Sequence, residues 1–371
     1  MRRTFIFGVF FLMLMPFSAS AAAPVFEVFG WIPYWRASAG STDALSHLEN
    51  FSSLMPFGYI VQDDGSLHDA FGFDDPSATS TAALLLATAH ARGVRIVPTV
   101  MWSNTSAIHT ILSSTSRRIA LEDAIAKLVK DNKFDGIDID FENKLAKTRP
   151  YFSLFLKGLY ARMGKKWVYC SIEARTPTSS AFVVTPKNIE YANDYVAINK
   201  YCDRVHIMAY DQGAIDLKLN AAADGTPYVP VADPQWVKKV IAVAAQTISK
   251  KKIIIGIPTY GYEYDLIPLS QGYRYARHWA LNPGYATDLA KQLGITPTRN
   301  HAGEMSFTYA PTTTPQTASA LPDPRRVVWW SDAGAIQDKI DLARTLGVRG
   351  VALFKIDGGE DPALWNILPK R

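Results

Sequence analysis

The sequence contains little that would support several common kinds of function. It has only two cysteines, its seven histidines show no metal-ligand spacing, and it carries no glycine-rich phosphate loop. Its lysines and arginines are dispersed, apart from short clusters such as residues 250–252, and the formal net charge is a mild +5. No apolar run after residue 23 is long enough to cross a bilayer. These scarcities argue against metal chemistry, nucleotide or nucleic-acid binding, and a membrane-spanning mature protein.

The first 23 residues have the pattern of a secretory signal peptide. Arg2 and Arg3 precede an apolar run over residues 5–17, and small residues then offer a cleavage site near residues 21–23. No cysteine stands at that site, so a lipoprotein anchor is unsupported. Cleavage would lower the formal charge from +5 to +3. We therefore expect a secreted, periplasmic or cell-envelope protein, with residues 24–371 forming the mature fold.

The two cysteines, Cys170 and Cys202, lie on or beside consecutive predicted strands. In an exported protein they could form a disulfide bond. Two buried free thiols would fit the same pattern, and the sequence leaves both alternatives open.

Short apolar runs alternate with helical patterns along most of the chain. Asp233 followed by Pro234 is a helix start signal, and Gly93 and Gly347 stand where helical patterns end. Alternating strands and helices predict parallel β-α-β units, and eight of them predict an α/β protein with a closed (β/α)8 TIM barrel. The eight strand candidates are residues 25–35, 51–61, 94–102, 134–142, 167–174, 204–210, 252–260 and 350–356.

Residues 261–326 interrupt this alternation. They are rich in tyrosine, proline and threonine, include the tract APTTTPQTASALPDP, and contain few long helical patterns. We interpret them as a small insertion lobe after the seventh strand, beside the barrel mouth. The segment is too short for an independent domain.

The stretch DGIDIDFENK places three acids at alternate positions of the predicted fourth strand. Side chains two apart share a strand face, so Asp138, Asp140 and Glu142 lie together, while Asp135 has the opposite parity and is expected to be structural. A strand with one solvent-exposed face would show the same alternation of polar and apolar residues. In a barrel, however, these acids would point into the lumen, with Glu142 nearest the mouth where active sites lie. Burial and like charge should then raise at least one of their pKa values.

The segment DGIDIDFE resembles the DGxDxDxE signature of family 18 glycoside hydrolases, the chitinase-type barrels. The segments HIMAYDQ and IIGIPTYGY resemble that family's sixth-strand and seventh-strand motifs, and residues 331–365 resemble its last helix and eighth strand. The resemblance covers most of the chain from Val25 to Trp365. The segments NDYVAINKYCDRVHIMAYDQ and GGEDPALW are similar to those of bacterial spore-cortex and cell-wall members.

The resemblance implies a role for each acidic residue. Glu142 would be the general acid, Asp140 would orient the substrate's 2-acetamido group, and Asp138 would hold the proton of Asp140 in the resting state. Tyr210 and Asp211 would bind the acetamido group. The family is a substrate-assisted exception to the usual pair of catalytic carboxylates. No metal or organic cofactor is then required.

Aromatic side chains at strand ends are candidates for stacking on sugar rings, although core packing explains such residues equally well. Phe354 stands where the family usually has a tryptophan, and its smaller ring would stack less well. The third strand also departs from the family, because PTVMWSN replaces an S-x-G-G pattern. Glu173 could contact substrate, or form a salt bridge with Arg175 or another neighbour. The candidate substrate-binding residues are Tyr34, Trp102, Met208, Tyr260 and Phe354.

The leading hypothesis is an exported, monomeric, retaining glycosidase that acts on β-linked N-acetylglucosamine polymers, either chitin and its oligomers or peptidoglycan glycan. A chitinase-like carbohydrate-binding protein is the main alternative, but such proteins commonly lose the catalytic glutamate, which is present here as Glu142. A divalent metal on Asp138, Asp140 and Glu142 is a third hypothesis. It is disfavoured because barrel metal sites usually gather carboxylates from different strands.

Overall fold

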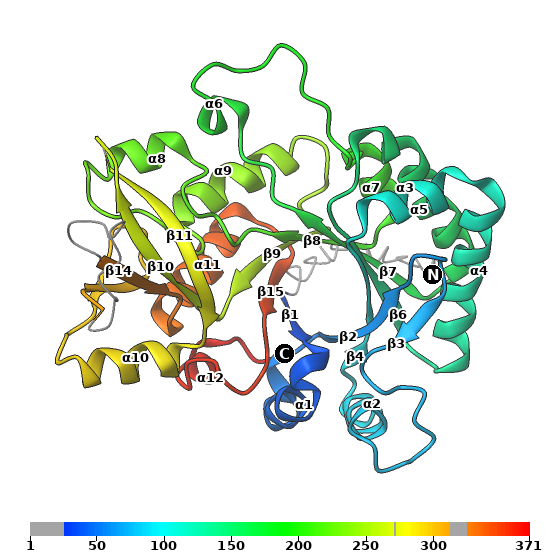
Figure 1. Ribbon diagram of the computed structural model, residues 1–371. Coiled ribbons are helices and arrows are strands. Elements are labelled where there is room, and N and C mark those ends of the chain that lie inside the picture. Colours follow the sequence, from blue (N-terminus) through cyan, green and yellow to red (C-terminus); the bar gives the residue numbers. More distant parts are fainter. Residues whose placement is uncertain (1–25, 271, 312–324) are drawn as a thin grey trace, which may run out of the picture.

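The computed structural model describes residues 26–270, 272–311 and 325–371, so the predicted signal peptide lies outside the described residues. Eight parallel strands form a closed barrel in the order β1-β15-β9-β8-β7-β6-β5-β2, and β2 pairs with β1 to complete the circle (Figure 1). The predicted (β/α)8 fold is confirmed. The barrel strands are β1 (Glu27–Ile32), β2 (Ser53–Val61), β5 (Thr99–Trp102), β6 (Gly136–Phe141), β7 (Trp167–Glu173), β8 (Arg204–Met208), β9 (Ile253–Pro258) and β15 (Gly350–Phe354).

The predicted strand over residues 94–102 is divided in the structure. Its first part is the short strand β4 (Arg95–Ile96), which pairs with the start of β2, and its second part is β5. Pro98 lies between the two parts and has no N–H to donate to a ladder, which explains the interruption. A further short strand, β3 (Leu67–Asp69), folds back on β2 in antiparallel orientation.

Helices follow most barrel strands and cover the outside of the barrel (Figure 1). The Asp233 carboxylate caps α9 by accepting from the Gln235 N–H, and Gly347 ends α11 in the left-handed conformation, as their positions in the sequence predicted. Across the described ranges, no helix is long and apolar enough to cross a membrane. The helices are α1 (Ala37–Ser46), α2 (Thr81–Ala91), α3 (Thr105–Ser113), α4 (Thr115–Asp131), α5 (Arg149–Met163), α6 (Thr178–Ala181), α7 (Tyr195–Tyr201), α8 (Leu217–Ala222), α9 (Pro234–Ala244), α10 (Pro283–Gln292), α11 (Ala333–Leu346) and α12 (Leu364–Ile367).

The two faces of β6 divide as the period-two pattern predicts. Ile137, Ile139 and Phe141 are completely buried on the helix side, where the Phe141 ring stacks on Phe155 of α5 with 5.2 Å between centroids. The intervening acids therefore face the barrel interior. This packing fixes the register of β6 and determines where its carboxylates emerge.

A five-stranded antiparallel sheet lies between β9 and β15 in the sequence and stands beside the barrel (Figure 1). Its last strand continues to Trp330, beyond the Arg326 boundary suggested by the sequence. Buried Glu304 joins this lobe to the barrel, because its carboxylate accepts from the Val231 N–H at 2.8 Å and from Trp329 Nε1 at 2.6 Å. The strands are β10 (Gly261–Pro268), β11 (Tyr273–Leu281), β12 (Thr298–Arg299), β13 (Met305–Tyr309) and β14 (Arg325–Trp330).

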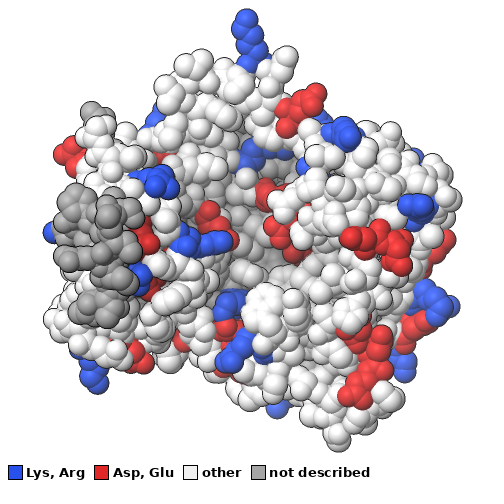
Figure 2. Space-filling model, in the orientation of Figure 1, with Lys and Arg blue, Asp and Glu red and all other residues white. Residues whose placement is uncertain are grey.

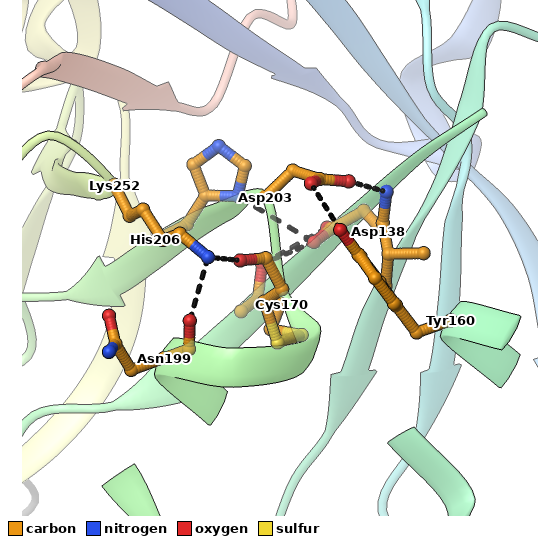
Figure 3. The surroundings of a disulfide bond; sticks show 10 residues. Asp138, Tyr160, Cys170, Asn199, Asp203, His206 and Lys252 are labelled. Carbon is orange, nitrogen blue, oxygen red and sulfur yellow. Dashed lines mark hydrogen bonds and ion pairs between the residues drawn. A yellow bond between two sulfur atoms is a disulfide. The ribbon is translucent and has the colours of Figure 1, made fainter. Parts of the chain in front are cut away.

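Cys170 and Cys202 form a disulfide bond, with 5.9 Å between their Cα atoms, which resolves the choice left open by the sequence (Figure 3). The bond connects β7 to the residues just before β8. Asp203 supports the same junction by accepting from the Val168 N–H at 2.9 Å, and Lys252 Nζ donates to the Cys202 carbonyl at 2.8 Å. Two neighbouring barrel strands are thus held together on their helix-facing side.

Candidate active site

Asp138 occupies the deepest of the three acidic positions on β6 and is fully buried. Its Oδ2 accepts from Thr99 Oγ1 at 2.9 Å and from Trp31 Nε1 at 3.3 Å, and Ser171 Oγ donates to it at 3.0 Å. His206 Nδ1 lies 3.6 Å from Oδ1 (Figure 3). Donors from three other strands therefore fix this carboxylate in the barrel core, beneath Asp140 and Glu142 along the chain, and the His206 ring of a fourth strand lies close to it.

Asp140 and Glu142 lie nearer the mouth in less fully bonded surroundings. Asp140 is 6% exposed, and its Oδ1 atom is buried without a hydrogen-bond partner. Burial, followed by the negative charges of Glu142 and Asp138, raises the pKa of Asp140 well above its usual value. Burial and then the charge of Glu173 also raise the pKa of Glu142. Both environments favour the protonated carboxyl group.

Tyr210 and Asp211 follow β8 at the same end of the barrel. Asp211 has a φ of 56°, in the left-handed region, which turns the chain sharply after Tyr210. Tyr260 and Tyr262 both donate to Asp211 Oδ1, at 2.5 and 2.7 Å, so the first strand of the lobe helps to hold this carboxylate. Burial raises the pKa of Tyr210 and of Tyr260 well above the usual range, and both phenols remain hydrogen-bond donors.

Three adjoining cavities lie across the barrel mouth, and Asp140 and Glu142 line both the central one and the one near Trp102. Figure 2 shows a hollow in this face of the molecule, with atoms of Asp and Glu residues inside it. The central cavity has a volume of about 320 Å³, and it is flanked by cavities of about 520 Å³ near Trp102 and about 380 Å³ beside the lobe. Phe354 lines all three. The central cavity is lined by Trp31, Phe57, Asp140, Glu142, Glu173, Ala174, Thr176, Met208, Tyr210, Asp211, Gln212, Ile215, Trp236 and Phe354.

The structure places the predicted substrate-binding residues around these cavities, but with unequal access. Tyr34 is 38% exposed and shares the cavity near β5 with Trp102, whose own side chain is almost buried against Phe141. Met208 lines the central cavity. Tyr260 lines the cavity beside the lobe, yet its hydroxyl is engaged by Asp211, so it supports that carboxylate besides offering a ring face.

Sequence reasoning missed Lys144 and identified only part of the role of Glu173. Lys144 is buried, and its Nζ lies 3.7 Å from Glu173 Oε2. Lys144 is therefore the ion-pair partner of Glu173, in place of Arg175. Arg175 instead lies between the rings of Tyr191 and Tyr195. The period of two gave no signal for Lys144, because β6 ends at Phe141 and Asn143 is in the left-handed conformation. Its pairing with Glu173 depends on tertiary structure.

Asp135 faces away from this site, as its opposite strand parity predicted. Its Oδ2 accepts from the Ile96 N–H at 2.8 Å and contacts His90 Nε2 at 2.9 Å, so it joins β6 to β4 and α2. Within residues 26–270, 272–311 and 325–371, no group of three or more His, Cys, Asp or Glu side chains could hold a metal ion. The arrangement offers a carboxyl group of raised pKa in a cavity lined by aromatic and polar side chains.

Comparison with known proteins identifies the class. The family model of glycosyl hydrolases family 18 matches residues 88–359. The chain belongs to this family and is a glycoside hydrolase.

Among individual proteins, the uncharacterized glycosylase YvbX of Bacillus subtilis (strain 168) is 27% identical over 70% of this chain and 68% of its own length. The cortical fragment-lytic enzyme of Bacillus subtilis is 29% identical over 63% of this chain, but the match spans only 49% of that enzyme. The spore cortex-lytic enzyme SleL of Bacillus megaterium QM B1551 has a TM-score of 0.70 at 23% identity, covering 93% of this chain and 75% of SleL. A class V chitinase of Pseudomonas fluorescens Pf-5 has a TM-score of 0.73 at 21% identity, covering 93% and 98%. The two structural matches show a shared fold.

Proposed function

We propose that the protein is a retaining glycosidase that hydrolyses β-linked N-acetylglucosamine polymers by substrate-assisted catalysis, with Glu142 as the general acid. The observation that carries the proposal is the position of Glu142, a carboxyl group of raised pKa that lines the central cavity beside buried Asp140. A carboxyl group that stays protonated near the working pH can donate its proton to a leaving oxygen.

In the proposed reaction, Glu142 transfers its proton to the glycosidic oxygen as the bond to the anomeric carbon breaks. The carbonyl oxygen of the sugar's own 2-acetamido group attacks that carbon and forms a cyclic intermediate, so no enzyme nucleophile is needed. Water then opens the ring while the Glu142 carboxylate accepts its proton. Two displacements at one carbon retain the configuration, and Glu142 ends the cycle protonated.

The remaining polar groups would position the acetamido group during these steps. Asp140 would accept from its N–H, since Asp140 Oδ1 is buried with no partner in the unliganded structure. Asp138 would hold the proton of Asp140 in the resting state. Tyr210 and Asp211 would bind the acetamido group and hold the distorted sugar, with Tyr260 and Tyr262 fixing Asp211.

The substrate requirement follows from this chemistry, because the cleaved sugar must carry an N-acetyl group. Chitin, its oligomers and peptidoglycan glycan all satisfy it, and similarity to a cortical fragment-lytic enzyme supports a cell-wall glycan. The signal-peptide pattern supports action outside the cytoplasm, as a secreted, periplasmic or cell-envelope protein. We propose that it acts as a monomer. The two cavities that adjoin the central one would take the neighbouring sugars of a chain.

The decisive experiment measures release of reducing ends from soluble chitin oligomers and from purified peptidoglycan. Wild type is compared with Glu142→Gln, and with Glu49→Gln as a matched control, because Glu49 is half exposed at the opposite end of the barrel. We expect activity on one of the polymers that disappears only in Glu142→Gln. Sugar binding by wild type without turnover would instead identify a chitinase-like carbohydrate-binding protein.

A further inference from the structure

A lysine side chain is buried immediately beyond the proposed general acid. Asn143, with a φ of 56°, adopts the left-handed conformation and turns the chain back after Glu142. The Lys144 side chain is thereby turned into the protein: it is only 1% exposed, and its Nζ donates to the Phe141 carbonyl. The ammonium also lies 4.8 Å from the centre of the Phe152 ring on α5.

Glu173, at the end of the neighbouring strand β7, is held facing this lysine. Its Oε2 lies 3.7 Å from Lys144 Nζ and accepts from Asn193 Nδ2 at 2.6 Å, while its Oε1 accepts from the Asn143 N–H at 3.1 Å. Glu173 also lines the central cavity together with Glu142. A cation and an anion are therefore fixed 3.7 Å apart beyond the ends of adjacent strands, and the anion shares the central cavity with Glu142.

Burying an ammonium group is costly unless nearby charges compensate it. Burial lowers the pKa of Lys144, and the charges of Glu173, Asp140 and Glu142 oppose that change. A hydrogen bond to the Phe141 carbonyl alone would not require a charged donor. The ammonium interacts electrostatically with three carboxyl groups, so its positive charge has an effect on them beyond the hydrogen bond that it donates.

We propose that Lys144 is a positioning residue of the reaction, which pairs with Glu173 and sets the electrostatic environment in which Glu142 gives up its proton. This inference rests on the proposed function of Glu142. The two members of the pair act on Glu142 in opposite directions: Lys144 favours its ionised form, and Glu173 favours its protonated form.

The direction of each effect follows from the charges around Glu142. Burial raises its pKa most, the charge of Glu173 raises it further, Lys144 lowers it, and Asp211 raises it. Removing Lys144 should therefore move ionisation of Glu142 to higher pH, and removing the charge of Glu173 should move it to lower pH. The titratable and charged groups around Glu142 are Asp140 on β6, Lys144 after it, Glu173 on β7, Tyr210 and Asp211 after β8, and Tyr34 and Asp63 in the adjoining cavity near β5.

The test is the pH dependence of kcat/KM on a chromogenic N-acetylglucosamine oligomer. The alkaline limb of this profile reports ionisation of the general acid in the free enzyme. The variants are Lys144→Met, Glu173→Gln and the double variant. Glu173→Gln removes charge at constant shape, and its hydrogen bonds can persist, because Asn193 Oδ1 has no partner and the amide can turn to accept.

We expect the alkaline limb to move to higher pH in Lys144→Met, to lower pH in Glu173→Gln, and to an intermediate position in the double variant. Limbs that superimpose on wild type, with activity reduced equally at every pH, would show a purely structural role and overturn the inference. If Lys144→Met does not fold, the Glu173→Gln variant decides the question alone. An alkaline limb at the wild-type pH in that variant would then contradict the inference.

The same assay separates this inference from the proposed function. Full activity in Glu142→Gln would show that Glu142 is not the general acid, and the Lys144 assignment would then lose its basis. Loss of activity in Glu142→Gln together with unmoved limbs in the other variants would reject only the role of Lys144.

Discussion

The ring of Phe354 lies nearly parallel to that of Tyr210, with 5.2 Å between centroids and 12° between planes. Trp31, Phe57 and Tyr260 contact Phe354 edge-on, so it is held on four sides by other aromatic rings. Its remaining face lines all three cavities of the mouth. Phe354, which the sequence resemblance suggested stands where the family usually has a tryptophan, is thus fixed by aromatic packing where the three cavities adjoin.

Phe354→Ala should weaken substrate binding more than it slows the chemical step. Loss of one aromatic contact, worth about 1.4 kcal/mol at most, should raise KM for N-acetylglucosamine oligomers about tenfold with a smaller change in kcat. Steady-state kinetics on a defined oligomer measure both constants. Phe182→Ala serves as the control, because Phe182 is 41% exposed on the loop after α6 and should leave KM unchanged. An unaltered KM in Phe354→Ala would show that the ring does not contact substrate.

The part of the fold that depends on local patterns could be predicted from the sequence. The alternation of strands and helices gave the barrel, and the period of two on β6 placed Asp138, Asp140 and Glu142 on one face. Helix caps such as Asp233 were visible because their partners are only a few residues away.

The surroundings of the acids could not be predicted, because they come from distant segments. Trp31, which donates to Asp138, is separated from it by 107 positions, and no local spacing indicates that contact. The Cys170–Cys202 bond required two Cα atoms to approach within 5.9 Å, which depends on strand pairing. Lys144 lay beyond the recognised pattern, and its inward direction follows from the backbone conformation of Asn143.

The pH dependence of the reaction should reflect the raised pKa of Glu142. Activity requires the protonated carboxyl, so kcat/KM should fall as pH rises through this pKa. The alkaline limb should therefore lie above pH 4.5, the ordinary value for glutamate, because burial and Glu173 both favour the proton. A profile recorded from about pH 3 to about pH 9, which spans the range over which carboxyl groups titrate in proteins, locates this limb. A fall in kcat/KM centred at or below the ordinary value would contradict the assignment.

Asp140→Asn should abolish most turnover and stabilise the fold at neutral pH. The folded-state pKa of Asp140 is raised, so the native state favours the protonated carboxyl, and the resulting stability is lost as pH rises from the unfolded-state pKa through the folded-state value. The variant cannot ionise at this position and avoids that loss. We expect its melting temperature at pH 7 to exceed that of wild type by about 2 °C, the effect of about 1 kcal/mol in a chain of this size.

Thermal unfolding of wild type and Asp140→Asn between pH 3 and 8 tests this expectation, with pH values chosen around the usual titration range of carboxyl groups. The difference between the two melting temperatures should grow with pH and vanish in acid. Asp131→Asn is the control, because Asp131 is half exposed on α4 and should show no such divergence. A variant that is less stable than wild type at every pH would indicate that Asp140 ionises at no cost to the fold.

Removing the disulfide bond by Cys170→Ala with Cys202→Ala should lower stability without removing activity. The bond joins residues 32 positions apart, and closing a loop of that length stabilises a folded chain by about 3–4 kcal/mol through the unfolded state. Both side chains are fully buried on the helix side of the barrel, away from the cavities, so the double variant should keep its kcat/KM and melt several degrees lower. Wild type refolded with reductant should melt at the lower temperature, while reductant should not affect the double variant. Titration of thiols in denaturant provides the independent check, since the bonded protein has none to react, and two reactive thiols per chain in protein exported through an oxidising compartment would contradict the bond.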